Sequence, residues 1–139
     1  MTPSLPFNIV VLTGAGISAE SGLATFRNDG GVWAGHKIDD VCTPDAFARN
    51  AELVCGFYDE RKAEASNASP NSAHIALAEL EDFWIVSKIG DFTLITQNVD
   101  DLHDRAGSRN VIQMHGRLNS AFCAECGVQL ARLGPLEDN

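Results

Sequence analysis

The feature that most constrains the fold is an apolar segment that ends in glycines. Residues Ile9 to Thr13 read I-V-V-L-T and run directly into Gly14-Ala15-Gly16, after which Ile17 to Ser21 can continue as a helix. Five apolar or β-favouring residues predict a buried strand, and the glycines predict a tight turn into a helix start. Because glycines let a ligand approach the backbone and free N–H groups favour an anion, this segment predicts a phosphate or pyrophosphate site. An ordinary strand-to-helix turn would look similar.

We expect the first strand over Asn8 to Thr13, and two further β segments follow it. They are Phe92 to Thr96 and Val111 to Met114, and helical patterns separate the strands. Strands that alternate with helices predict an α/β fold with a doubly wound, Rossmann-like parallel sheet, whose ligand binds at the carboxyl ends of the strands. With 139 residues and 45% hydrophobic content, the chain can form one modest domain with a real core.

Helices are expected to dominate the interval between the first two strands and to form a small insert there. Thr43-Pro44-Asp45 is a capping signal with proline at the first helical position, and Ser69-Pro70 repeats it. The expected helices run from Pro44 through Ala48, from about Ala51 to Ala65 with Leu53, Val54 and Phe57 on the apolar face, and from Ser69 onward with a buried stripe of Ile75, Ala76, Leu77 and Leu80. A further helix is expected over Val99 to Ala106, with Gly107 as its stop.

The charge of the chain argues against one class of partner. Nineteen acidic residues against ten basic ones give a formal charge of −9, whereas a nucleic-acid surface needs a basic stripe. The N-terminal segment lacks the basic region of a signal peptide, and the apolar run after it is too short to span a membrane. We therefore expect a cytoplasmic protein that binds neither nucleic acid nor membrane.

Four separated motifs occur along the chain in a fixed order. They are G-A-G-I-S-A-E-S-G-L-A-T-F-R from Gly14 to Arg27, T-Q-N-V-D-D-L-H-D-R-A-G from Thr96 to Gly107, V-I-Q-M-H-G from Val111 to Gly116, and C-A-E-C-G from Cys123 to Gly127. In this order they resemble the motifs of the sirtuins, the NAD-dependent protein-lysine deacylases. The resemblance covers almost the whole chain, but only the first part of that family's catalytic core.

The resemblance implies that the chain binds NAD. Gly22 to Gly35 reads as a long loop with Trp33 as an aromatic anchor, and it corresponds to the cofactor-binding loop of the family. The fork of Arg27 suits a phosphate and the ring of Phe26 suits a sugar carbon, although a surface charge and a core ring are the simpler interpretations. The expected cofactor-binding residues are Gly14, Ala15, Gly16, Ile17, Ser18, Ala19, Glu20, Ser21, Thr25, Phe26, Arg27, Trp33, Gln97, Asn98, Val99 and Asp100.

The residues after the second and third strands are the candidates for catalysis. By themselves Asn98 and Asp100 could simply cap the next helix. The resemblance implies instead that Gln97 and Asn98 line the ribose site and that Asp100, with the backbone near Ile17, holds the nicotinamide carboxamide. His115 follows a strand directly, so its imidazole is expected to face the cleft and to act as general base on a ribose hydroxyl. The expected catalytic residues are His115 and Asn98; the family's reaction transfers the acyl group of lysine to ADP-ribose.

Tyr58 and Arg61 are spaced i, i+3 on an expected helix, so their side chains can address one ligand. The pair resembles the Tyr-x-x-Arg motif of sirtuins that remove succinyl and malonyl groups. That resemblance implies that Arg61 pairs with the carboxylate of the acyl group and that Tyr58 donates a hydrogen bond to it. A surface arginine among charged neighbours is the alternative.

Cys123 and Cys126 have the spacing of a zinc knuckle, but structural zinc takes four ligands. The sirtuin module supplies a second pair further on, so Cys123 and Cys126 are either half of a zinc site or a free dithiol.

We expect a partial catalytic domain made of an NAD-binding part (1–36 and 90–118), the helical insert (37–89) and the start of a zinc module (119–139). Such a chain should be inactive alone unless a second polypeptide completes the fold around an acyl-lysine protein or peptide. A catalytically silent NAD-binding or interaction module is the alternative.

Overall fold

The computed structural model describes residues 7–25 and 32–131 of the chain, so Phe26 and Arg27 lie outside the described residues. Its elements, in chain order, are β1 (Ile9–Thr13), α1 (Ala15–Ser18), η1 (Ala19–Ser21), β2 (Val32–Trp33), β3 (His36–Lys37), α2 (Ile38–Val41), α3 (Pro44–Arg49), α4 (Ala51–Asn67), α5 (Ser72–Val86), β4 (Phe92–Thr96), α6 (Leu102–Ala106), β5 (Val111–Gln113), β6 (Ser120–Phe122) and β7 (Gln129–Ala131). Among them, no helix is long and apolar enough to cross a membrane.

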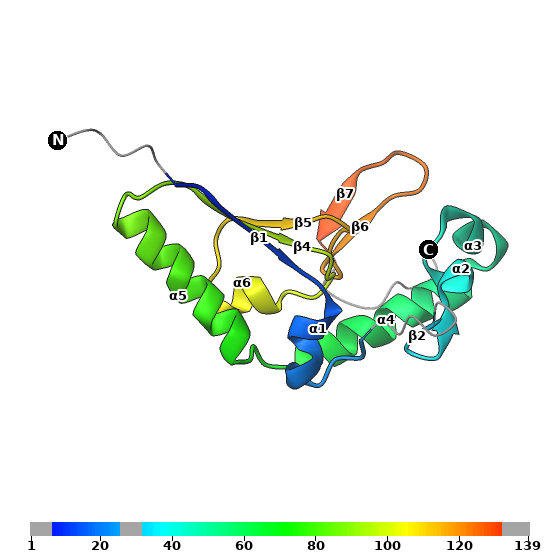
Figure 1. Cartoon of the computed structure of the whole chain (residues 1–139). Helices are drawn as coiled ribbons and strands as arrows, with labels where there is room; N and C mark the ends of the chain where they lie inside the picture. Colours follow the sequence, from blue (N-terminus) through cyan, green and yellow to red (C-terminus); the bar gives the residue numbers. More distant parts are fainter. Residues whose placement is uncertain (1–6, 26–31, 132–139) are drawn as a thin grey trace.

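The three expected strands form one parallel sheet, which confirms the predicted fold class. Its order is β1-β4-β5, with Ile9 beside Phe92 and Leu94 beside Val111. The helical stretch α2 to α5 connects β1 to β4, as the capping signals predicted. All three strands end at the same edge of the sheet, so the loops that follow them meet there (Figure 1).

The two faces of the sheet have different surroundings. Phe92, Leu94 and Thr96 of the central strand are buried on the face that α5 and α6 cover (Figure 1). On the opposite face, Val10 and Leu12 are 66% and 63% exposed. The described residues therefore contribute one helical layer of the expected doubly wound sheet.

Helix α5 begins later than the sequence predicted. Asn71, not Ser69, is its N-cap: the Asn71 side chain accepts hydrogen bonds from the backbone of Ala73 and His74, and the His74 ring accepts one from the Asn71 N–H. This reciprocal capping box satisfies the backbone N–H groups of both Asn71 and His74, at the two ends of the first helical turn. Ser69, which is followed by proline, caps no helix in this way. The prediction of a start at Ser69 was wrong.

The expected buried stripe of α5 was also wrong. Ile75 is 45% exposed and Leu80 is 36% exposed, whereas His74, Ala78 and Glu81 are buried. The buried residues follow an i, i+4, i+7 spacing and face the segment around α6. Glu81 is buried because its carboxylate accepts hydrogen bonds from the backbone N–H groups of Arg109 (2.9 Å) and Asn110 (2.8 Å).

Helices α3 and α4 begin at the residues that the sequence predicted. Thr43 caps α3 through a 3.0 Å bond from the Ala46 N–H, and Asn50 caps α4 through a 3.0 Å bond from the Leu53 N–H. On α4, Val54 and Phe57 are buried as expected, while Leu53 is 38% exposed and does not belong to the buried face. The long helix α4 brings Tyr58 and Arg61 toward the carboxyl edge of the sheet.

Replacement of Glu81 by alanine should lower the free energy of unfolding by about 2–3 kcal/mol. The substitution leaves two part-buried backbone N–H groups, those of Arg109 and Asn110, without their carboxylate acceptor. Glu79→Ala on the exposed side of the same helix is the matched control and should change it by less than about 0.5 kcal/mol. Urea denaturation of the three proteins measures the difference; equal losses would contradict the buried role of Glu81.

Candidate functional site

A cleft of about 640 Å³ lies where the loops after β1, β4 and β5 meet α4. Loops from the sheet edge supply polar groups, and the helical insert supplies the opposite wall. The cleft is lined by Ala15, Ser18, Leu23, Ala24, Trp33, Ile38, Cys42, Tyr58, Arg61, Glu64, Ala65, Gln97, Asn98, Val99, Asp100, His115 and Leu118. Ten of the residues expected from the sequence are therefore gathered around one cavity: Ala15, Ser18, Trp33, Tyr58, Arg61, Gln97, Asn98, Val99, Asp100 and His115.

Three buried polar side chains join two loops at the bottom of this cleft. Ser18 donates a 3.0 Å hydrogen bond to the Oδ2 of Asp100, and the Nδ2 of Asn98 donates a 3.1 Å bond to the Ser18 Oγ. The Oδ1 of Asp100 accepts from the N–H of Leu102 (3.1 Å), where α6 begins. Helix α6 therefore begins at Leu102, not at Val99 as predicted, because residues 97–101 remain in the loop that forms this network.

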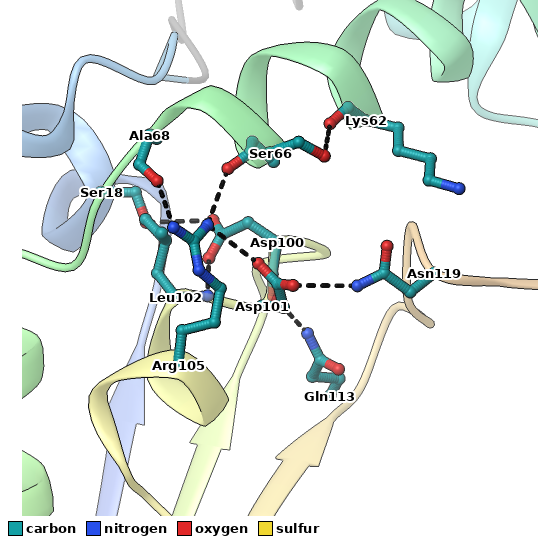
Figure 2. A network of polar contacts seen from close by, with 11 residues as sticks. Ser18, Lys62, Ser66, Ala68, Asp100, Asp101, Leu102, Arg105, Gln113 and Asn119 are labelled. Carbon is teal, nitrogen blue, oxygen red and sulfur yellow. Dashed lines mark hydrogen bonds and ion pairs between the residues drawn. The ribbon is translucent and has the colours of Figure 1, made fainter. Parts of the chain in front are cut away.

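A second set of contacts ties the loop after β4 to its surroundings (Figure 2). Gln113 donates to the carbonyl oxygen of Asp100 at 2.5 Å. Arg105 donates to the carbonyl oxygens of Ala65 (3.0 Å) and Ala68 (2.6 Å), at the end of α4. The Ala65 carbonyl also accepts from the Ala68 N–H, so this arginine adds a second donor there and, through Ala68, fixes the end of α4 against the sheet edge.

The glycine turn differs from its prediction in one respect. Helix α1 is a single turn of four residues followed by the 3₁₀ turn η1, so a long helix dipole does not point at the cleft. Gly14 has extended backbone angles, and a Cβ at Gly16 would meet no atom within 4 Å. Neither glycine is needed for the turn itself; Gly16 leaves open space beside the backbone.

The remaining predicted cofactor residues lie beside that turn. Gly14, Gly16 and Ile17 belong to the turn and to α1, Ala19, Glu20 and Ser21 form η1, and Thr25 is half-buried just after it.

Asn71 is a residue of this site that the sequence analysis missed. Its Nδ2 donates to the carbonyl oxygen of Ile17 (2.7 Å) and to the Ser21 Oγ (3.0 Å). The N-cap of α5 thereby holds the turn that follows β1. The signal in the sequence is the N-x-x-H capping box of Asn71 and His74, which lies two residues after the Ser69-Pro70 signal.

His115 lies at the mouth of the cleft with its ring orientation fixed. Its Nδ1 is 3.0 Å from the carbonyl oxygen of Gln97. Because a carbonyl oxygen can only accept, Nδ1 carries the proton and the neutral ring keeps the lone pair on Nε2. This arrangement is the one that a general base requires.

The opposite wall is an aromatic cluster around Tyr58 and Arg61. Trp33 packs edge-on against Phe57 (5.1 Å between ring centroids) and Tyr58 (6.4 Å), and the Arg61 guanidinium lies 5.0 Å from the Phe57 ring centroid. Burial, with the neighbouring Cys42 thiol, raises the pKa of Tyr58 well above its usual value. The phenol therefore stays protonated and can donate a hydrogen bond at any physiological pH.

Cys123 and Cys126 lie in the turn between β6 and β7. The backbone N–H groups of Cys126 and Glu125, together with the Cys126 side chain, lower the pKa of the Cys123 thiol, a setting that favours the thiolate a metal binds. Over residues 7–25 and 32–131, no group of three or more metal-binding side chains is present. Zinc binding by Cys123 and Cys126 stays a prediction.

A buried histidine pair lies beneath the cleft. His74 and His103 are 0% and 2% exposed, with ring centroids 4.8 Å apart, and the His103 Nε2 is 3.0 Å from the Thr13 Oγ1. Burial lowers the pKa of both rings, the proximity of His74 lowers that of His103 further, and the Asp100 carboxylate opposes both shifts. His103 thus has a structural position in the core.

The histidine pair should make stability depend on pH. An unfolded histidine takes up a proton near pH 6.5, whereas the folded pair stays neutral to lower pH, so the free energy of unfolding falls as pH drops below about 6.5. Thermal unfolding at pH 7.5 and 5.5 measures this loss, roughly 1 kcal/mol per histidine for each unit of pKa difference. His103→Gln should reduce the slope; an unchanged slope would contradict the assignment.

Comparison with known proteins places the chain in a family. The model of the Sir2 family matches residues 14–134. The chain is 57% identical over 121 residues to an NAD-dependent protein deacylase of Bdellovibrio bacteriovorus, and 56% identical over 122 residues to one of Pasteurella multocida. Each match covers 86% of this chain and 50% of the relative, so the chain spans about half the length of these curated relatives.

Solved structures agree with the family match. A Sir2 homologue in complex with NAD superposes with a TM-score of 0.81 at 44% identity, over 95% of this chain and 50% of that one. A Sir2 structure with a p53 peptide and NAD⁺ superposes with a TM-score of 0.71 at 35% identity, over 90% of this chain and 47% of the other. On its motifs, its parallel sheet and these matches, the chain belongs to the Sir2 family.

Proposed function

We propose that this chain is the NAD-binding part of an NAD-dependent protein-lysine deacylase. The observation that carries the proposal is His115, whose Nδ1 is held by the Gln97 carbonyl and whose Nε2 is left as an acceptor at the cleft. The curated relatives named NAD-dependent protein deacylase and the NAD complex of a Sir2 homologue support it.

The cleft fits the nicotinamide and ribose half of NAD. Its volume of about 640 Å³ lies within the range of small-molecule sites, roughly 300–1,000 Å³. The open space at Gly16 lets a ligand approach the backbone, and the Asn98 and Asp100 side chains are already oriented by Ser18. In this proposal, Asp100 and the backbone near Ile17 hold the carboxamide, and Gln97 and Asn98 contact the ribose.

When bound, NAD supplies the electrophilic ribose carbon and carries nicotinamide as the leaving group. The part of this chain is to bind, orient and accept a proton. Nε2 of His115 takes the proton of a ribose hydroxyl, and the Gln97 carbonyl stabilises the charged ring through Nδ1.

The acyl-lysine of a protein or peptide is the proposed second substrate. Arg61 and Tyr58 line the cleft together, and Arg61 is buried, so an acyl group that ends in a carboxylate would meet a cation and a phenol donor. This arrangement supports a preference for succinyl and malonyl groups, with acetyl groups also accepted. We propose a cytoplasmic location and zinc binding by Cys123 and Cys126 with two further ligands from outside the described residues.

Replacement of His115 by alanine should abolish deacylation in an active preparation of the protein. Loss of a general base lowers kcat by about 10²–10⁴-fold. Thermal unfolding should stay close to that of the unchanged protein, because His115 is exposed and supports no core contact. Near-normal turnover of the variant would show that another group is the base.

Replacement of Arg61 by methionine should reduce kcat/KM for succinyl-lysine peptide at least tenfold more than for acetyl-lysine peptide. Only the succinyl group presents a carboxylate to the guanidinium. Arg49→Met, at a side chain that is 60% exposed on α3, is the control and should affect neither substrate. Equal losses on both substrates would mean that Arg61 serves the fold or the cofactor.

A further inference from the structure

The guanidinium of Arg61 is not a free cation in this structure. Its Nε and Nη2 donate to the two carboxylate oxygens of Glu64 at 2.9 and 2.7 Å, and Nη2 also approaches Glu60 at 3.4 Å. Only Nη1 has no partner among the described residues, and it is buried. One edge of the guanidinium fork is therefore occupied by a carboxylate that belongs to the chain itself.

Glu64 is positioned to compete with a ligand. It lies one helical turn after Arg61 on α4 and lines the same cleft, whereas its side chain is still 48% exposed. Arg61 with its two glutamates carries one positive and two negative formal charges. The carboxylate of an acyl group that enters the cleft would pair with the Arg61 guanidinium. It thus approaches a cluster of Arg61, Glu60 and Glu64 whose net formal charge is negative.

We propose that Glu64 is a specificity-determining residue that weakens the preference of this site for acyl groups ending in a carboxylate. The inference rests on the proposed function, because it concerns the substrate choice of that same cleft. A succinyl or malonyl group must either displace Glu64 from Arg61 or bind beside it through Nη1, and each route costs free energy through lost pairing or like-charge repulsion. An acetyl group carries no charge and does not meet this cost.

Glu64→Gln tests the proposal because glutamine keeps the length of the side chain and one acceptor oxygen but removes the charge. We expect KM and Kd for a succinyl-lysine peptide to fall roughly fivefold, the size of a half-exposed ion-pair interaction. The values for the matched acetyl-lysine peptide should change less than about twofold. Fluorescence anisotropy of labelled peptides gives Kd without turnover, and steady-state assays give KM.

Two further variants make the test specific. Glu60→Gln is the matched control: Glu60 is 69% exposed and approaches only Nη2, so its effect on succinyl-lysine should be clearly smaller. In an Arg61→Met background, the gain from Glu64→Gln for succinyl-lysine should shrink, because no pairing with the guanidinium is left to displace and only the direct repulsion by Glu64 remains.

Each outcome decides the proposal. Weaker or unchanged succinyl-lysine binding by Glu64→Gln, or an equal gain for both peptides, would overturn the role of Glu64 even if deacylation is intact. Absence of turnover with every acyl peptide, in a preparation that contains the whole catalytic domain, would instead contradict the proposed function, and the anisotropy comparison would still decide whether Glu64 opposes a carboxylate.

Discussion

The buried contact between Ser18 and Asp100 is the interaction on which the rest of the site depends. It joins the turn after β1 to the loop after β4. The second carboxylate oxygen of Asp100 accepts a hydrogen bond from the N–H of Leu102, the first residue of α6. A buried carboxylate is costly unless its oxygens are satisfied, and here each oxygen accepts a bond from a different segment. The contact thereby fixes the spacing of the two loops that hold Asn98 and the glycine turn.

Helices on the same side of the sheet reinforce this contact through polar groups. Asn71 at the start of α5 holds the carbonyl of Ile17, Glu81 of α5 holds the backbone before β5, and Arg105 of α6 holds the end of α4. Each of these side chains forms hydrogen bonds with backbone groups of another segment in a part-buried position. The cleft is therefore built by hydrogen bonds that cross between elements as much as by apolar packing.

The two walls of the cleft are suited to different tasks. The sheet edge presents a fixed polar network and the His115 ring, which suit a dinucleotide and proton transfer. In the proposed function, helix α4 presents Tyr58 and the Arg61–Glu64 pair to the acyl group. The residues proposed for the cofactor and those proposed for the acyl group thus lie on separate segments of the chain.

The sequence by itself determined the three parallel strands, the family and ten of the residues that line the cleft, because apolar runs, glycine turns and the motifs are local patterns. It misplaced the start of α5 and its buried stripe, since burial of His74 and Glu81 depends on partners about 30 residues away. It also missed the capping box at Asn71 and the pairing of Arg61 with Glu64, although both are local spacings on one helix. Only the tertiary structure decided the contacts of Asn71, His74 and Glu81 with distant segments, because the partner of a buried donor or charge is set by elements that meet in space.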